Sequence, residues 1–280
     1  MGRVIKLFIY FFAYQFLTGA IMIGGYMIAN QTTDIPSAEQ FMHDHLIWMQ
    51  LLYALLLTAH LLGWKYVKRS DFSLSFPHTE KVLLTSVVFI IGMGCWTNYL
   101  TELTELPDRF ADEFRMLMNH PIGIFSIVIM APLMEELLVR GGMQGHLMRK
   151  WKNPLWAIVV SSLIFGLIHG NPMQIFFAFI SGIALGWIYY RTGSLLPGML
   201  MHFINNGTSV LLFHLSGGKD ETMTEALGTT GAICLALVGV ALTVWSIWYI
   251  KTRLIPNQIV WKETPAPVEE VIVSEDKEQV

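Results

Sequence analysis

The sequence has little charge. Asp, Glu, Lys and Arg make up only 14% of its 280 residues, whereas soluble domains average about 25%. Its mean hydropathy is +0.51, and its formal net charge is −3. This balance indicates a protein surrounded mostly by lipid. No excess of basic residues favours binding to nucleic acid, and we expect no such partner.

Cysteine is scarce, and no removable leader is recognisable. Cys95 and Cys234 each lie inside an apolar run without a CxxC pattern, so we expect neither a disulfide nor a cysteine metal site. The apolar stretch 4–29 is much longer than the core of a secretory signal, which is about 7–15 residues. It also lacks a small-residue cleavage site. We therefore expect a retained first transmembrane helix.

Long apolar runs recur along the whole chain. A helix needs about 20 mostly apolar residues to cross a bilayer. By that measure the sequence predicts an all-α, polytopic membrane protein with about eight transmembrane helices. The runs are 4–29, 45–64, 81–100, 121–148, 154–170, 172–190, 196–215 and 227–250.

The distribution of basic residues predicts the orientation. Lys and Arg collect in alternate loops, and basic loops lie on the cytoplasmic side. These residues are Lys65, Lys68, Arg69, Lys81, Arg149, Lys150, Lys152, Arg191, Lys251 and Arg253. The other loops are acidic or neutral, so we expect both termini to be cytoplasmic.

Four regions follow from this pattern. Residues 1–119 hold N-terminal transmembrane helices and an amphipathic segment, 101–119, expected at the outer surface. Residues 120–215 form the helical core that contains the polar motifs. Residues 216–256 hold the last transmembrane helix. Residues 257–280 are polar and acidic, and read as a disordered cytoplasmic tail.

The first polar motif is Glu135-Glu136-Leu-Leu-Val-Arg140. Ionisable groups inside a bilayer are costly, so each is a functional candidate. Glu136 and Arg140 are four residues apart and share a helix face, where they can pair. Glu135 points about 100° away and is left for another task, such as general acid–base catalysis. The alternative is an ion-pair cluster that only joins helices.

The other two motifs each carry a histidine. His169 closes Phe165-Gly-Leu-Ile-His169, and should reach a depth similar to Glu136 across the turn that joins their helices. His202 and Asn206 are four apart on one face of the next polar helix. An imidazole and an amide together can stabilise an oxyanion. Alternatively, His202 could be a metal ligand. Asn206 could form a hydrogen bond between helices.

EExxxR, FxxxH and HxxxN in this order resemble the CPBP family of intramembrane proteases. That family includes the type II CAAX prenyl endopeptidases and bacterial bacteriocin-processing or immunity proteins. The resemblance covers roughly 120–210. It implies that Glu135 and His169 activate water, that His202 and Asn206 form an oxyanion hole, and that Glu136 paired to Arg140 orients Glu135.

The resemblance leaves the metal open. The chain has no HExxH signature of zinc proteases. Glu135, His169 and His202 could nevertheless form a His₂Glu set that binds Zn²⁺ with an open position. No other cofactor is indicated.

Our leading interpretation is a membrane-embedded endopeptidase of the bacterial cytoplasmic membrane. It would hydrolyse membrane-associated or lipidated peptides and proteins. A non-catalytic immunity or scaffold protein of the same fold is one alternative. A proton-coupled transporter is the other, although the sequence shows no inverted repeat of the kind such transporters often carry.

Overall fold

The computed structural model describes residues 1–104, 106–151, 153–219 and 221–256, and every regular element within them is helical. The predicted tail, 257–280, lies outside these residues. The first half contains α1 (Gly2–Asn30), α2 (Ile35–Asp44), α3 (Leu46–Gly63), the 3₁₀ turn η1 (Arg69–Phe72), α4 (Thr79–Thr104) and α5 (Ala111–Met118). The second half contains α6 (Pro121–Phe125), η2 (Ser126–Met130), α7 (Ala131–Glu136), η3 (Leu137–Gln144), α8 (Gly145–Lys150), α9 (Pro154–Leu167), α10 (Pro172–Thr192), α11 (Leu195–Leu215), α12 (Met223–Tyr249) and η4 (Ile250–Leu254).

Six helices in the described part of the chain are long and apolar enough to cross a membrane. They are Gly2–Asn30, Leu46–Gly63, Thr79–Thr104, Pro121–Lys150, Pro172–Thr192 and Met223–Leu254. All eight predicted runs are helical, but α9 has only 14 residues. The 21-residue α11 is outside the six, and it carries the polar residues His202, Asn205 and Asn206. The chain is therefore a multi-pass helical protein with six candidate spans.

Local sequence signals explain where the core helices begin. Pro154 and Pro172 stand in the first turns of α9 and α10, where a missing N–H costs nothing. The side chain of Asn153 accepts a hydrogen bond from Leu155 N at 2.9 Å, and Ser194 caps α11 in the same way. These short, capped turns keep α9, α10 and α11 close together.

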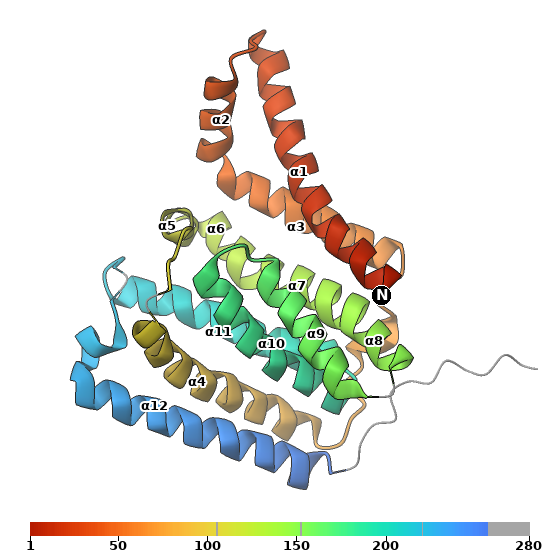
Figure 1. Cartoon of the computed structure of the whole chain (residues 1–280), viewed down its shortest axis with the longest axis vertical. Helices are drawn as coiled ribbons and strands as arrows, with labels where there is room; N and C mark the ends of the chain where they lie inside the picture. The colour runs from red at the N-terminus through yellow and green to blue at the C-terminus, as the bar shows by residue number, and fades with distance from the viewer. Residues whose placement is uncertain (105, 152, 220, 257–280) are drawn as a thin grey trace, which may run out of the picture.

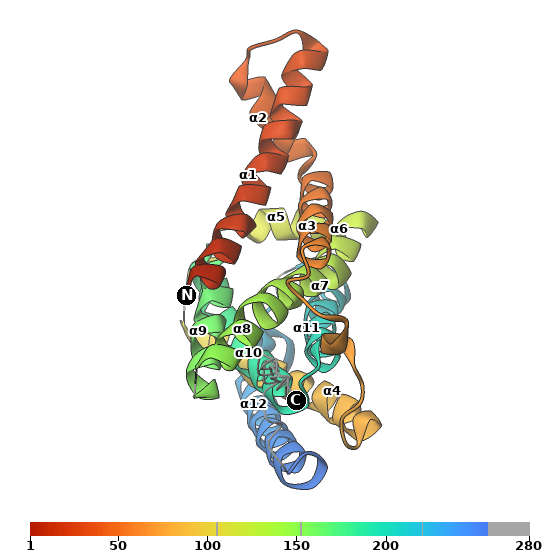
Figure 2. The same ribbon diagram turned by 90° about the vertical axis from the view of Figure 1, so that its right-hand side faces the viewer.

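The helices form a bundle from which the first two helices project (Figure 1). α4 and α12 run side by side along one edge of the bundle, and α9, α10 and α11 lie between them and α7–α8. α1 leaves the bundle and turns back through α2, and a view rotated by 90° shows the same projection (Figure 2). The polar motifs therefore lie in the bundle and not in the projecting part.

The long helix from Pro121 to Lys150 is interrupted twice by π-helical turns, η2 and η3. Proline removes a backbone donor and cannot continue an ordinary α-helix without loss. In η2 the Ala131 N–H bonds to the Ser126 carbonyl, so the Ile127 carbonyl would next need a donor at Pro132, which has none. Such π-helical turns are frequent at functional sites.

The segment predicted to be amphipathic, 101–119, divides between two helices. Thr101–Thr104 completes α4, and Ala111–Met118 forms the short α5. The buried residue of α5 is Leu117, which packs in a small cluster with Ile127, Val128 and Val210. Thus α5 covers one end of the core helices. Its position relative to a membrane surface remains a prediction.

Candidate active site

Glu136 is fully buried and joins two helices. Its Oε1 lies 3.0 Å from Arg140 Nη1 and 3.1 Å from His202 Nδ1 on α11. The expected pairing of Glu136 with Arg140 is therefore present. A Cβ added at Gly198 of α11 would lie 3.2 Å from Glu136 Oε2. Glycine at 198 thus gives the carboxylate the room it occupies.

Arg140 is held from three sides at 1% exposure. Besides Glu136, its Nη2 donates to the Gly182 carbonyl of α10 at 3.2 Å. Its guanidinium lies 4.3 Å from the centre of the Phe165 ring, a cation–π contact. Phe165, the first residue of the FxxxH motif, therefore supports the cation that balances Glu136.

His202 lies between the two glutamates. While Nδ1 contacts Glu136, Nε2 lies 3.6 Å from Glu135 Oε2. The Glu135 side chain is 13% exposed and that of Glu136 is 0% exposed. The Phe165 ring packs edge-on against His202, with ring centres 5.6 Å apart. The two carboxylates therefore differ in accessibility, and one imidazole connects them.

Asn206 donates its side-chain amide to the Ile127 carbonyl at 2.8 Å. This is the carbonyl that Pro132 leaves without a backbone donor in η2. Buried carbonyls rarely go without a partner, and the amide supplies one. Asn205 donates to Asn206 Oδ1 at 3.2 Å, which fixes the amide orientation. One of the two N–H groups of Asn206 is therefore committed to the helix, and one remains.

His169 stands at the end of α9 and is half-buried. Its Nδ1 lies 2.7 Å from the Phe165 carbonyl, and its ring packs edge-on against Phe165. Within the described ranges, no ion pair or hydrogen bond joins His169 to Glu135. The imidazole that contacts Glu135 is His202, with Nε2 at 3.6 Å. The shared role in water activation that the resemblance implies for Glu135 and His169 stays a prediction. Phe165, which touches both histidines, is the link between them.

The possible zinc ligands Glu135, His169 and His202 do not form one cluster in the described part of the chain. Among the residues that the structure describes, no group of three or more His, Cys, Asp and Glu side chains is placed to hold a metal ion. One nitrogen of His202 is already engaged by Glu136. Glu135 and His202 lie together, but His169 does not complete a three-ligand group with them.

Sequence reasoning missed a buried polar ladder next to the site. Gln144 follows Arg140 by four residues, and its Nε2 donates to the Gly186 carbonyl at 2.8 Å. Arg140 bonds the Gly182 carbonyl in the same way, so both side chains join the long helix to α10. Ser161 of α9 donates to Gln144 Oε1 at 3.3 Å. Glu136, Arg140 and Gln144 are spaced four residues apart, and this spacing was the signal that could have predicted the ladder.

A second missed residue is Tyr53 of α3. It is 2% exposed, and its hydroxyl lies 4.0 Å from the sulfur of Met134, the residue before Glu135. Tyr53 also lines a cavity of about 240 Å³. The other lining residues are Gln15 and Thr18 of α1 and Met49 and Gln50 of α3. A cavity with polar lining residues thus lies between the first two spans, and one of those residues, Tyr53, contacts the helix that carries the glutamates.

Comparison with known proteins points to the same region. Residues 118–208 match the family described as type II CAAX prenyl endopeptidase Rce1-like. The chain is 34% identical over 110 residues to the membrane-embedded CAAX protease MroQ of Staphylococcus aureus strain USA300. That match covers 38% of this chain and 44% of the relative, so it spans less than half of the relative's length. No solved structure is significantly similar.

Proposed function

We propose that this chain, whose residues 118–208 match the Rce1-like family of CAAX prenyl endopeptidases, is a membrane-embedded endopeptidase. It would hydrolyse a peptide bond in a membrane-associated or lipidated peptide or protein. The matched region contains all seven motif residues, which are Glu135, Glu136, Arg140, Phe165, His169, His202 and Asn206.

The observation that carries the proposal is the unequal placement of the two glutamates around His202. Glu136 is fully buried and committed to Arg140 and His202. Glu135 is partly exposed and has His202 at 3.6 Å as its partner. Only a carboxylate that meets water can activate it. We therefore assign Glu135 as the general base and Glu136 as the positioning residue.

The proposed chemistry needs only these side chains and water. Glu135 removes a proton from water as the water oxygen bonds to the scissile carbonyl carbon. The carbonyl oxygen gains the negative charge and accepts hydrogen bonds from His202 and from the remaining N–H of Asn206. The C–N bond then breaks, and Glu135 returns the proton to the leaving amine.

His169 has a supporting role in this proposal. Its Nδ1 is occupied by the Phe165 carbonyl, which leaves Nε2 able to bond a water or the substrate. It would hold the water for Glu135 without direct contact between the two side chains. Zinc remains a proposal from residue chemistry alone, and no step above passes through a metal.

The polar cavity at Tyr53 suggests how a peptide could approach. An extended peptide brings unpaired backbone groups into the membrane, and these groups need partners. Gln15 and Gln50 offer amides there, and Tyr53 connects the cavity to Met134 and thus to Glu135. We propose that the peptide enters between α1 and α3. The bacterial cytoplasmic membrane is the location we propose for the protein.

Cleavage of a membrane-peptide library by the purified protein tests the function. The variants are Glu135→Gln and His169→Ala, and Glu80→Gln removes an exposed carboxylate of α4 as the matched control. We expect Glu80→Gln to cleave like the wild type and both site variants to lose cleavage. A chelator arm, with zinc added back, measures metal dependence separately.

Three outcomes would contradict the proposal. Equal cleavage by wild type and Glu135→Gln would remove Glu135 as the base and indicate a contaminating protease. A folded wild-type protein that cleaves nothing in the library would favour the non-catalytic immunity or scaffold interpretation. Uptake of a solute that depends on a proton gradient and on Glu135 would favour a transporter.

A further inference from the structure

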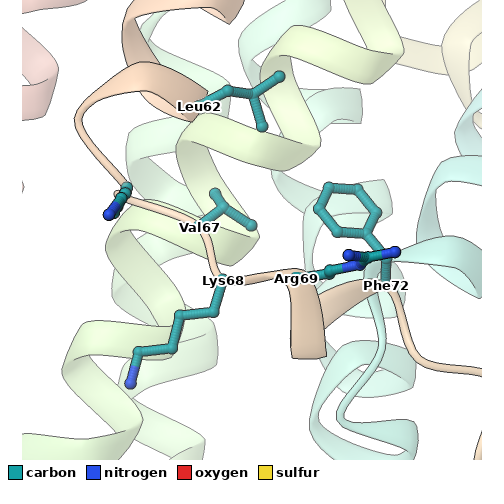
Figure 3. Close-up of a pocket in the computed structure, with 6 residues that line it drawn as sticks. Leu62, Val67, Lys68, Arg69 and Phe72 are labelled. Carbon is teal, nitrogen blue, oxygen red and sulfur yellow. The ribbon is translucent and has the colours of Figure 1, made fainter.

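A second cavity lies away from the glutamates, at the loop that follows α3. It has a volume of about 530 Å³ and is lined by Leu62, Lys65, Val67, Lys68, Arg69 and Phe72. Figure 3 shows the apolar side chains of Leu62, Val67 and Phe72, with Arg69 beside Phe72 and the side chain of Lys68 extending away from them. The cavity therefore combines an apolar wall with three cations from one short stretch of chain.

The three cations that line this cavity would attract an anion. Lys65, Lys68 and Arg69 are all exposed, and none forms an ion pair within 4.0 Å in the described part of the chain. The nearest acid in sequence, Asp71, is 4% exposed and accepts from the backbone N–H of Lys68 at 2.8 Å. Asp71 thus shapes the turn η1, and Lys68 keeps its side-chain charge for another partner.

One of these cations, Lys65, has a backbone conformation that is unfavourable for a non-glycine residue. Lys65 follows the end of α3 with φ of 55°, a left-handed conformation that helix ends usually assign to glycine. The Lys65 N–H bonds to the Leu62 carbonyl at 3.1 Å, and the Tyr66 N–H bonds to the Leu61 carbonyl at 3.0 Å. A strained non-glycine residue at such a position is a signal of function.

We expect the cavity to lie at the depth of lipid headgroups, because it begins directly after α3, a candidate membrane span. Trp64 is 70% exposed beside it, as expected of an aromatic residue at a membrane interface. Leu62 is 46% exposed and can meet acyl chains. Two more cations are close, because Arg3 and Lys6 of α1 lie 5.0 and 5.9 Å from the Tyr66 ring.

We propose that this cavity binds the headgroup phosphate of an anionic phospholipid, with the acyl chains along Leu62 and Trp64. Basic pockets at the ends of transmembrane helices bind acidic headgroups in this way. The wall of the cavity also touches the helix of the glutamates, because a Cβ at Gly141, next to Arg140, would lie 2.6 Å from Val67 Cγ2. A bound lipid would thus brace the loop against η3.

Native mass spectrometry of the full-length protein tests the site with phosphatidylglycerol, phosphatidylcholine and inorganic phosphate as separate probes. The pocket variant is Lys65→Gln, Lys68→Gln and Arg69→Gln. The matched control is Lys81→Gln, Lys251→Gln and Arg253→Gln, which removes the same charge from other exposed positions. Neither variant touches the residues assigned to catalysis, so the readout is independent of the proposed function.

We expect phosphatidylglycerol to bind the wild type and the control, and phosphatidylcholine to bind neither tightly. The pocket variant should lose at least about tenfold in affinity, because each Lys or Arg near an anionic surface contributes about fivefold. Leu62→Glu, which adds a carboxylate to the cavity and removes no cation, should also weaken binding. This second variant keeps the test decisive if the triple variant folds poorly.

Three results would overturn the proposal. An equal loss in the pocket and control variants would mean that only net charge matters. If the wild type retains inorganic phosphate but not phosphatidylglycerol, the cavity is a site for free anions. The third result is a pocket variant that retains phosphatidylglycerol like the wild type but shows a higher KM for a peptide substrate in neutral detergent. That result would mean that the cavity binds a peptide carboxylate.

Discussion

His202 and Glu136 lie 66 residues apart in the chain, yet His202 Nδ1 and Glu136 Oε1 are 3.1 Å apart at the centre of the bundle. This contact points the other imidazole nitrogen towards Glu135, at 3.6 Å. A buried carboxylate thereby fixes the orientation of a histidine that serves a second, more accessible carboxylate.

Replacing Glu135 by Gln should abolish cleavage without unfolding the protein. Gln keeps the size of the side chain but cannot take a proton, and general bases contribute roughly 10²- to 10⁴-fold. Because Glu135 is partly exposed, the free energy of unfolding should change little. Turnover of a cleaved library peptide and reversible unfolding in mixed micelles measure the two effects. A large loss of stability would show that Glu135 is structural.

Replacing Glu136 by Leu should lower both the free energy of unfolding and the activity. It would leave Arg140 buried without its anion, and breaking a buried pair from one side costs roughly 3–5 kcal/mol. Glu80→Leu, at an exposed position of α4, is the matched control and should unfold like the wild type. If Glu136→Leu unfolds no more easily than Glu80→Leu, the buried pair does not stabilise the bundle.

Replacing Gly198 by Ala should lower turnover by displacing a carboxylate. The new Cβ would lie 3.2 Å from Glu136 Oε2, so Glu136 and the attached His202 would have to shift by a few tenths of an ångström. Small displacements near reacting groups can cost large factors in rate. Gly94→Ala in α4 is the control, since nothing lies within 4 Å of its added Cβ. Equal kcat values in the two variants would show that the site tolerates the shift.

The Asn206–Ile127 hydrogen bond should be coupled to Pro132. Asn206→Leu should lower the free energy of unfolding by about 1–3 kcal/mol, because it leaves a buried carbonyl unpaired. Pro132→Ala restores an N–H to the long helix and should reduce that loss in a double-mutant cycle. Activity should not return, because the oxyanion donor is still missing. Strict additivity of the two stability changes would argue against the coupling.

Replacing Gln50 by Leu should raise KM more than it lowers kcat, because the cavity at Tyr53 is proposed to hold peptide backbone away from the reacting atoms. Gln40→Leu is the control, since Gln40 is an exposed residue of α2 that bonds Asp44 at 2.8 Å. Initial-rate kinetics with a cleaved library peptide separate the two constants. An unchanged KM would place the entry path elsewhere.

Much of the fold could be predicted because it rests on local rules. The apolar runs gave helices at all eight predicted positions, and the Pro, Asn and Ser residues before the core helices set where they begin. The α-helical repeat also predicted the Glu136–Arg140 pair, since four residues bring two side chains to one face. The sequence predicted eight spans, but only six helices of the described residues are long and apolar enough, because α9 has 14 residues and α11 carries polar side chains.

Contacts between helices could not be predicted from local sequence rules. Local spacing could not show that His202, and not His169, contacts Glu135, because that depends on how α11 and the long helix cross. The same holds for the carbonyls of Gly182 and Gly186 that bind Arg140 and Gln144. The cavity after α3 depends on the turn at Lys65 and on Val67 packing against Gly141.

The sequence by itself therefore determined that this is a helical membrane protein with glutamates, histidines and an arginine inside its apolar segments, because composition and helical periodicity act locally. Only the tertiary structure decided which carboxylate is buried, which imidazole it orients, and which carbonyl Asn206 satisfies. Those properties arise where separate helices meet, and the packing of glycines such as Gly198 sets how closely they can approach.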